Sequence, residues 1–553
     1  MSLAARDGPV GLPLGRLPGR RRALRGCWQP HGQRGCRLDL AVPALLCAFC
    51  LAAQPAPAAS AAAAAAPVAC RLPGVSQAVL CGSVRRALDP ARPQGVMIEV
   101  HYAMIPALAR RKADDAVLFF AGGPGQGAIT LAGAWAARYA RLGQRRDLVF
   151  VDQRGTGRSA PLVCPDDDER TALQPLASRT DESARLDRLR DCRRALQTLA
   201  YGDLRFFTTA LAMADVDAVR QALGVARIDL VGGSYGTRAA LELMRQFPAT
   251  VRRAVLDGVA PPDMHLPDAA ARDNQAALDA LLAACAAEPA CTAAHPDLRS
   301  QWLGLLQALP RDVTLPHPVT GRPESVRLRR DTVLALVRAP LYAPALAAAL
   351  PAAIEQAALG RWSPLAALAG ALGGGGGGAA AMATGMHFSV VCAEDLGPAA
   401  PPPDPADIAA AAAPGNVFGA SFAALYRRAC ADWPLGRVDP AFYSLPPAPA
   451  PTWLLSGGLD PVTPPRHGAR VALALGPKAR HIVVANAGHG VTSLGCIREA
   501  VTRFINTDDD TAALATEADC AAGVPRPVAF APPGSLPTPP ASTAARAASR
   551  ATR

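Results

Sequence analysis

The stretch Val231-Gly232-Gly233-Ser234-Tyr235-Gly236 governs the interpretation of this chain. It follows a short run rich in Val and Ile, residues 227–231, which is typical of a buried parallel strand, and it precedes a helical pattern over residues 237–247. Glycines on both sides of the serine allow a sharp turn that presents its side chain above the sheet. The stretch therefore predicts that Ser234 is a nucleophile, although such a short pattern also occurs as a plain glycine-rich turn.

The charge of the chain argues against a nucleic-acid partner. The 553 residues carry a formal charge of +12, which by itself would be typical of proteins that bind phosphates. Residues 1–69 contribute a net +6 and the residues after Asp519 a net +4, so about +2 remains for the body. Because a nearly neutral body lacks the basic character that phosphate binding needs, we expect no nucleic acid.

The first residues have the pattern of an export signal. An Arg-rich segment precedes an apolar run at residues 38–53, which is too short to span a bilayer comfortably and leads into Ala-, Pro- and Ser-rich sequence. We expect residues 1–69 to be a signal peptide and Ala-rich leader, with no stable membrane span after cleavage. The mature protein would then be exported, either periplasmic or secreted.

Ten cysteines follow this leader, an even number that in an exported chain indicates disulfide bonds. The sequence alone leaves the connectivity open, but pairing nearest neighbours keeps each loop within one predicted element. That order gives Cys70–Cys81, Cys164–Cys192, Cys285–Cys291, Cys392–Cys430 and Cys496–Cys520.

Strands and helices alternate around the serine turn. The predicted strands cover residues 96–105, 115–120, 147–152, 227–231, 252–257, 451–456 and 480–485, and helices are predicted over 181–224. This alternation predicts an α/β fold with a doubly wound, mostly parallel sheet. The glycine-punctuated loop at residues 153–159 lacks the Lys-Ser/Thr ending of a phosphate-binding loop, so we expect no nucleotide there.

A long insertion separates two parts of the predicted core. Residues 266–440 lack regular strand alternation and have the pattern of Ala- and Leu-rich helices, broken by a run of six glycines at residues 373–378 that has the character of a flexible linker. We expect core segments at residues 70–265 and 441–524, a helical lid at 266–440, and a disordered tail rich in Pro, Ala and Ser at 525–553.

Three motifs together resemble one family. They are Ala121-Gly-Gly-Pro-Gly125, Asp152-Gln-Arg-Gly-Thr-Gly-Arg-Ser159 and Gly232-Gly-Ser-Tyr-Gly-Thr237. Over about residues 75–525 the chain is similar to the prolyl aminopeptidase and tripeptidyl aminopeptidase family of α/β-hydrolases. The resemblance implies that fold, with residues 441–524 as the C-terminal region of the tripeptidyl type. Ala121 stands where prolyl aminopeptidases usually carry histidine, which favours the exported tripeptidyl branch.

Asp460 and His489 complete a predicted catalytic triad with Ser234. Both lie just after predicted strands, where active-site loops gather, and their order in the chain is the one that this fold shows. His489 would take the proton of Ser234, and Asp460 would hold the imidazole in the required tautomer. Asp257, which also ends a strand, is an alternative acid. None of the nine histidines has metal-ligand spacing, so we expect neither a metal nor a cofactor.

Two backbone N–H groups are predicted to form the oxyanion hole. One belongs to Tyr235 and the other to Gly123, with Gly122 as the alternative, because the glycine-rich loop at residues 121–127 follows a buried strand. His467 and His481 are interpreted as a surface residue of a helix and a residue at a strand start.

These residues predict an exported serine aminopeptidase that releases short N-terminal units from peptides with a free N-terminus through an acyl-enzyme. A carboxylesterase or lipase would use the same triad, and a catalytically silent binding protein could share the fold. Glu394 is the candidate for binding the substrate amine, although it could instead cap a helix or face solvent. The sequence leaves the oligomeric state open.

Overall fold

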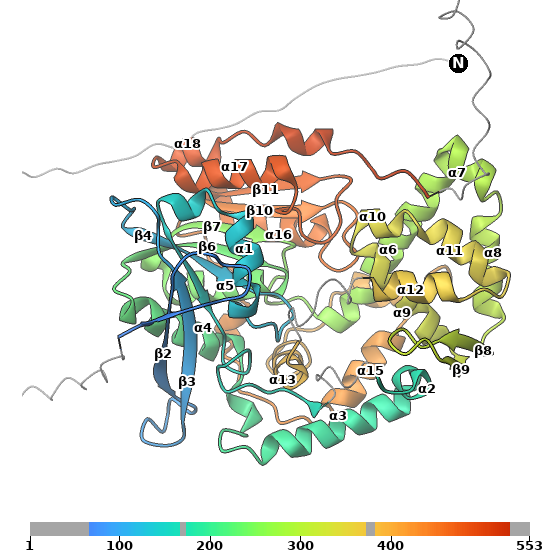
Figure 1. Ribbon diagram of the computed structural model, residues 1–553, viewed down its shortest axis with the longest axis horizontal. Coiled ribbons are helices and arrows are strands. Elements are labelled where there is room, and N and C mark those ends of the chain that lie inside the picture. The colour runs from blue at the N-terminus through green and yellow to red at the C-terminus, as the bar shows by residue number, and fades with distance from the viewer. Residues whose placement is uncertain (1–65, 166–172, 372–381, 531–553) are drawn as a thin grey trace, which may run out of the picture. The chain divides into compact units, whose positions relative to one another are not determined.

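A nine-stranded sheet forms the core of the computed structural model, which describes residues 66–165, 173–371 and 382–530 (Figure 1). The strand order is β1-β2-β3-β5-β4-β6-β7-β10-β11. The strands are β1 (Val68–Cys70), β2 (Val79–Ala87), β3 (Met97–Ile105), β4 (Asp115–Phe120), β5 (Asp147–Val151), β6 (Arg227–Gly233), β7 (Val251–Asp257), β10 (Thr452–Gly457) and β11 (Ala479–Val484). From β5 to β11 all neighbours are parallel, whereas β1 to β3 are antiparallel, so the predicted mostly parallel sheet is confirmed.

Helices cover both faces of this sheet. One face packs against α4 (Thr209–Ala222), α5 (Tyr235–Gln246) and α16 (Pro465–Leu475), and the other against α1 (Ala132–Arg138) and α17 (Gly495–Asn506). Every residue of β4 and β5 is buried, which is why these strands are continuous apolar runs in the sequence rather than alternating ones. The six parallel strands therefore carry their C-terminal loops on a rigid base.

The insertion that is predicted to be a lid, called the lid below, lies between β7 and β10. Its helices run from α6 (Leu266–Ala287) through α7 (Pro289–Ala294), α8 (Leu298–Gln307), α9 (Arg330–Leu341), α10 (Pro344–Ala347), α11 (Leu350–Ala358), α12 (Ser363–Gly370), α13 (Thr384–Glu394) and α14 (Pro405–Ala412) to α15 (Ser421–Cys430). The short helix α2 (Leu176–Thr180) and the longer helix α3 (Glu182–Gln197) come from the core segment, and α2 packs on the lid strand β9 (Pro323–Leu328) (Figure 1). The glycine run at residues 373–378 lies outside the described residues.

The expectation that the lid contains helices alone is wrong. An antiparallel hairpin, β8 (Arg311–Pro316) and β9 (Pro323–Leu328), lies within it. Buried and exposed side chains alternate over only a few residues of this hairpin. The buried ones are Leu315, Val326 and Leu328, which join the apolar core of the lid. Helical packing partners supply the burial that so short a hairpin could not supply by itself.

Both predicted ends need correction. Val68 and Ala69, placed in the leader, belong to β1 and pair with Cys81 and Leu80 of β2. At the other end, the Arg526 side chain donates to the Ala280 carbonyl oxygen, and the Phe530 N–H donates to the Ala348 carbonyl oxygen. Backbone pairing at the start and lid contacts at the end thus extend the ordered protein beyond the limits that composition indicated.

The five disulfides confirm the predicted nearest-neighbour order. Cys392–Cys430 joins α13 to α15, and Cys164–Cys192 ties α3 to the loop after β5. In the described ranges, no helix is both long and apolar enough to cross a bilayer.

Candidate active site

Ser234 sits on a strained turn between β6 and α5. Its backbone angles are φ 56° and ψ −126°, a conformation that residues other than glycine rarely adopt. A Cβ atom on Gly232 would lie 2.5 Å from the carbonyl oxygen of Gly236, and one on Gly236 would lie 2.4 Å from that of Phe120. The two glycines are therefore required by close backbone contacts, as the predicted turn demands.

Hydrogen bonds hold this turn against the neighbouring strand. The Ser234 N–H donates to the Asp257 carbonyl oxygen at 2.8 Å, and the Thr237 hydroxyl donates to the Ser234 carbonyl oxygen at 2.7 Å. Thr237 Oγ1 in turn accepts the Ala260 N–H. The half-buried Ser234 side chain is thus presented by a backbone fixed on both sides.

Asp460 and His489, the predicted acid and base, lie within hydrogen-bonding distance of each other. His489 Nδ1 lies 2.8 Å from Asp460 Oδ2, and the carboxylate also accepts the Thr463 hydroxyl and two backbone N–H groups of its own loop. On the other side, a Cβ atom at Gly258 would lie 3.2 Å from His489 Cε1. Gly258 directly follows Asp257, whose carbonyl oxygen accepts the Ser234 N–H. The imidazole and the serine therefore lie at the same edge of the sheet.

The side chain of Asp257, which was considered as an alternative acid, bonds to a backbone loop and not to the imidazole. Its carboxylate accepts the N–H groups of Val491 and Thr492 at 2.9 Å and the Thr492 hydroxyl at 2.7 Å. It therefore holds the loop that follows His489, whereas Asp460 faces the imidazole itself.

The electrostatics of the pair favour a charged carboxylate beside the imidazole. Burial alone would raise the pKa of Asp460, but the charge and hydrogen bond of His489 lower it below its ordinary value of 3.8. Burial alone would lower the pKa of His489, but Asp460 outweighs it and raises that pKa above 6.5. This is the arrangement that a base stabilised as imidazolium requires.

The glycine-rich loop after β4 lies directly against the serine. A Cβ atom on Gly122 would be 3.2 Å from the Ser234 Cβ, and Gly123 has φ 111°, in the region that favours glycine. Tyr235 begins α5, so its N–H is at the helix N-terminus, where donors are not used within the helix. The structure thus brings the two predicted oxyanion segments, residues 121–127 and Tyr235, next to the same serine.

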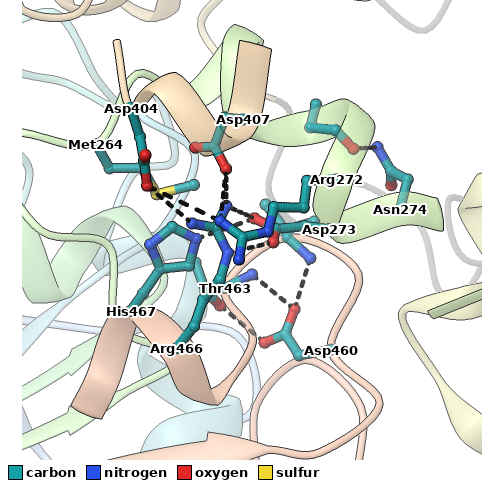
Figure 2. Close-up of polar contacts among 12 residues, drawn as sticks. Met264, Arg272, Asp273, Asn274, Asp404, Asp407, Asp460, Thr463, Arg466 and His467 are labelled. Carbon is teal, nitrogen blue, oxygen red and sulfur yellow. Dashed lines mark hydrogen bonds and ion pairs between the residues drawn. The ribbon is translucent and has the colours of Figure 1, made fainter. Parts of the chain in front are cut away.

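A network of ion pairs joins the acid loop to the lid, and sequence reasoning missed it. Figure 2 shows Asp273 of α6 beside Arg466 and His467, which follow Asp460 by six and seven residues. Asp273 accepts from Arg466 at 2.7 and 3.0 Å and lies 2.9 Å from His467 Nε2. Arg466 also pairs with Asp407 of α14 at 2.9 Å. His467, expected at the surface, is therefore buried because a lid carboxylate covers it.

We expect Asp273→Ala to destabilise the protein by about 2–4 kcal/mol, because it removes the acceptor that the half-buried Arg466 and the buried His467 share, while Asp407 still pairs with Arg466. Thermal or denaturant unfolding measures this effect. The matched control is Asp279→Ala on the same helix, whose exposed pair with Arg299 at 3.5 Å should contribute less than about 1 kcal/mol. Equal losses from both variants would contradict the role of the network.

The surroundings of Glu394 argue against its expected role as the amine ligand. The side chain is 1% exposed, and its two oxygens accept the Thr209 N–H at 2.6 Å and the Thr209 hydroxyl at 2.9 Å. Thr209 Oγ1 lies 2.7 Å from the Tyr235 hydroxyl, and Arg238 is 3.6 Å from the carboxylate. Burial raises the pKa of Glu394 to about 7, against the opposing charge of Arg238. The carboxylate supports the residue next to the nucleophile rather than facing open space.

Glu394→Gln should therefore lower activity toward all substrates alike, by about tenfold, because the change weakens the chain of hydrogen bonds that holds Tyr235. Thr209→Val removes the same link and should have a similar effect. The measurement compares kcat and KM for free-amine peptides, N-acetylated peptides and simple esters. A rise in KM restricted to free-amine substrates would instead restore the amine-ligand role.

Family comparisons agree with this geometry. The family model described as alpha/beta hydrolase fold matches residues 115–329, and the one described as TAP-like protein matches residues 415–514. The chain belongs to the TAP-like α/β-hydrolases. The first match contains the turn with Ser234, and the second contains Asp460 and His489, so both parts of the site of this TAP-like hydrolase fall within matched segments.

Several proteins to which this TAP-like hydrolase is similar are named as peptidases. It is 28% identical to the serine protease Hip1 of Mycobacterium tuberculosis over 40% of this chain and 44% of that protein. It is 30% identical to the tripeptidyl aminopeptidase of Streptomyces coelicolor over 33% of this chain and 36% of that one. The matches therefore span less than half the length of these relatives. Over that part, this chain is similar to proteins that are named as peptidases.

Among solved structures, the proline iminopeptidase of Mycobacterium smegmatis is 16% identical, with a TM-score of 0.33 over 78% of this chain and 100% of that one. This likeness is too low to bear on function.

Proposed function

We propose that this protein is an exported serine aminopeptidase that releases short N-terminal units from peptides through an acyl-enzyme. The observation that carries the proposal is the Asp460–His489 pair at the sheet edge that presents Ser234 on its strained turn. The names of the relatives, serine protease and tripeptidyl aminopeptidase, favour peptides over esters. The five disulfides support export, since such bonds persist in oxidising compartments.

Each residue would have one task in this reaction. Ser234 Oγ attacks the scissile carbonyl while His489 Nε2 takes its proton, and the negative charge that develops on the carbonyl oxygen is stabilised by the N–H groups of Tyr235 and Gly123. His489 then returns the proton to the leaving amine. Asp460 keeps the imidazole proton on Nδ1 and stabilises the imidazolium. Water releases the acyl group by the same sequence of proton transfers.

Contacts between the lid and the catalytic loops support limited access, as an exopeptidase requires. The His489 N–H donates to the carbonyl oxygen of Tyr342, which ends α9, and the two rings meet edge to face at 5.3 Å. The Ala383 N–H, just before α13, donates to the Gly125 carbonyl oxygen in the oxyanion loop. A lid held on both sides of the serine favours short chain ends over the middle of a folded protein.

A panel of substrates tests the proposal. It contains aminoacyl and tripeptidyl arylamides, their N-acetylated forms and p-nitrophenyl esters. We expect cleavage of free-amine arylamides to exceed cleavage of acetylated ones. Ester cleavage without amide cleavage would indicate a carboxylesterase, and neither reaction would indicate a silent binding protein.

The pH profile should reflect the raised pKa of His489. The imidazole must be neutral to act as a base, so activity is lost as the pH falls through that pKa, and the acidic limb of kcat/KM should lie above pH 6.5. In Asp460→Asn the attraction that raises the pKa is removed while burial remains. The limb of the residual activity should therefore move to lower pH. Profiles of kcat/KM between about pH 5 and 9 measure the acidic limb of each protein. Acidic limbs at the same pH in both proteins would contradict the pairing of Asp460 with His489.

A further inference from the structure

A cavity of about 1030 Å³ lies within the lid, apart from the catalytic triad. Its walls come from α2, α6, α9, α12, α15 and the hairpin β8–β9, which Figure 1 shows gathered on the lid side of the molecule. Most of the lining is apolar, and includes Leu315, Val326, Leu328, Leu334, Phe418 and Phe422. This volume is at the upper end of small-ligand sites, so it has room for several apolar side chains at once.

Two polar groups in this apolar wall lack partners among the described residues. Asn274 is 3% exposed, and its Oδ1 accepts no hydrogen bond, although its amide nitrogen donates to the Ala270 carbonyl oxygen. The Arg338 guanidinium stacks 4.7 Å above the Phe422 ring and has no carboxylate or carbonyl acceptor in the described parts of the chain. A buried acceptor and a half-buried cation left in this way are costly unless a ligand uses them.

The unpaired charges around the cavity are mainly positive. Arg179 and Arg185 also line it, and neither has an ion-pair partner within the described residues. The acidic lining residues Asp181 and Glu182 are paired with Arg329 and Arg428. Asp331 is exposed and is the remaining acid in the lining. An anionic ligand group is therefore favoured, and a substrate α-ammonium is disfavoured.

One connection leads from the cavity to the catalytic base. Arg338 lies four residues before Tyr342, which places the two on neighbouring turns at the end of α9. Tyr342 is the residue whose carbonyl oxygen holds the His489 N–H and whose ring meets the imidazole. Arg338 is thus about one helical turn from the residue that contacts the base.

A second connection leads to the oxyanion loop. The Phe422 ring lies 4.8 Å from the Tyr426 ring, and the Tyr426 hydroxyl is 2.8 Å from His387 Nε2. His387 Nδ1 is 3.3 Å from the Pro124 carbonyl oxygen, within the loop that carries Gly122 and Gly123. The same end of the cavity is therefore linked through packed side chains to the base and to the oxyanion loop.

We propose that this lid cavity binds the part of the substrate peptide beyond the scissile bond, with apolar side chains in the cavity and a carboxylate at Arg338. Asn274 Oδ1 accepts a peptide N–H of the same segment. The α-amine lies elsewhere because the unpaired charge here is positive. This assignment rests on the proposed peptidase function and names its substrate class, short apolar peptides with an anionic group downstream of the cleaved bond.

The experiment measures binding to the Ser234→Ala protein by calorimetry, which requires no turnover. The probes are a hexapeptide of alanine and leucine with a free C-terminal carboxylate, its C-terminal amide, the amide with one glutamate, and a glycine–serine hexapeptide acid. We expect the apolar acid to bind at least about tenfold more tightly than the apolar amide and the polar acid. Tight binding of the glutamate amide as well would show that a side-chain carboxylate serves equally, and weak binding of it would assign the site to the C-terminus.

Further substitutions in the Ser234→Ala protein show which residues produce the preference for the apolar acid. Arg338→Met, which keeps an apolar contact with Phe422, should abolish the preference for the acid over the amide, and Ala335→Trp should weaken the apolar peptides by narrowing the cavity. The matched control is Arg322→Met, an exposed lid arginine outside the cavity, which should bind all probes as the parent does. If Arg338→Met misfolds, Arg185→Met provides a second test of the cationic wall.

Two sets of results separate the inference from the proposed function. Equal affinity for all four hexapeptides, or an undiminished acid preference in both arginine variants, would overturn the cavity assignment even in an active peptidase. The expected binding pattern together with no amide cleavage by the wild-type protein would overturn the peptidase function and leave the cavity assignment standing.

Discussion

Ser234→Ala should abolish hydrolysis of amides and esters, with a loss on the order of 10⁶ in kcat, as for nucleophile removal in other serine hydrolases. The hydroxyl is the group that forms the acyl-enzyme, and the turn that presents it offers no substitute: Gly233 and Gly236 have no side-chain nucleophile, and the Tyr235 hydroxyl is bonded to Thr209. The backbone hydrogen bonds of the turn do not involve the Ser234 side chain, so the thermal midpoint should change little.

The control for this variant is Ser493→Ala. Ser493 is exposed, lies in the loop after His489 and donates weakly to the Gly490 carbonyl oxygen at 3.3 Å. Its kinetics should equal those of the parent. Amide hydrolysis retained at more than about a thousandth of the parent rate in carefully purified Ser234→Ala would remove Ser234 as the nucleophile.

Asp460→Asn should lower kcat by about 10⁴, the scale measured for the equivalent change in a well-studied serine protease. The asparagine amide in place of Oδ2 would present a donor to His489 Nδ1, which favours the wrong tautomer, and the imidazolium would lose its counter-charge. The fold should persist, because the loop N–H groups of Val462 and Thr463 bond to Oδ1, an acceptor that asparagine retains.

Asp257→Asn is the variant to compare with Asp460→Asn. In the parent protein the Asp257 carboxylate holds the loop after His489 rather than the imidazole. The change should therefore lower stability by about 1–3 kcal/mol and should lower activity far less than Asp460→Asn does. Steady-state kinetics and unfolding of both variants measure the ranking. A larger kinetic loss in Asp257→Asn than in Asp460→Asn would assign the acid to the earlier strand.

Features that depend on neighbouring residues were predictable from the sequence. The turn at Ser234 follows from glycines beside it, the buried strands from continuous apolar runs, and the disulfides from cysteines close in the chain. In each case the physical constraint acts over a few tens of residues at most, so the pattern and the structure that it specifies share one stretch of sequence.

What joins distant segments was decided only by the tertiary structure. Asp257 ends one strand and Asp460 follows another, and only the pairing of β7, β10 and β11 determines that Asp460 faces His489. Asp273 meets Arg466 across 193 residues, and Glu394 is covered by Thr209 across 185. Periodicity in a sequence shows which side chains are buried. The partner of each buried charged side chain is determined only when separate segments of the chain pack together.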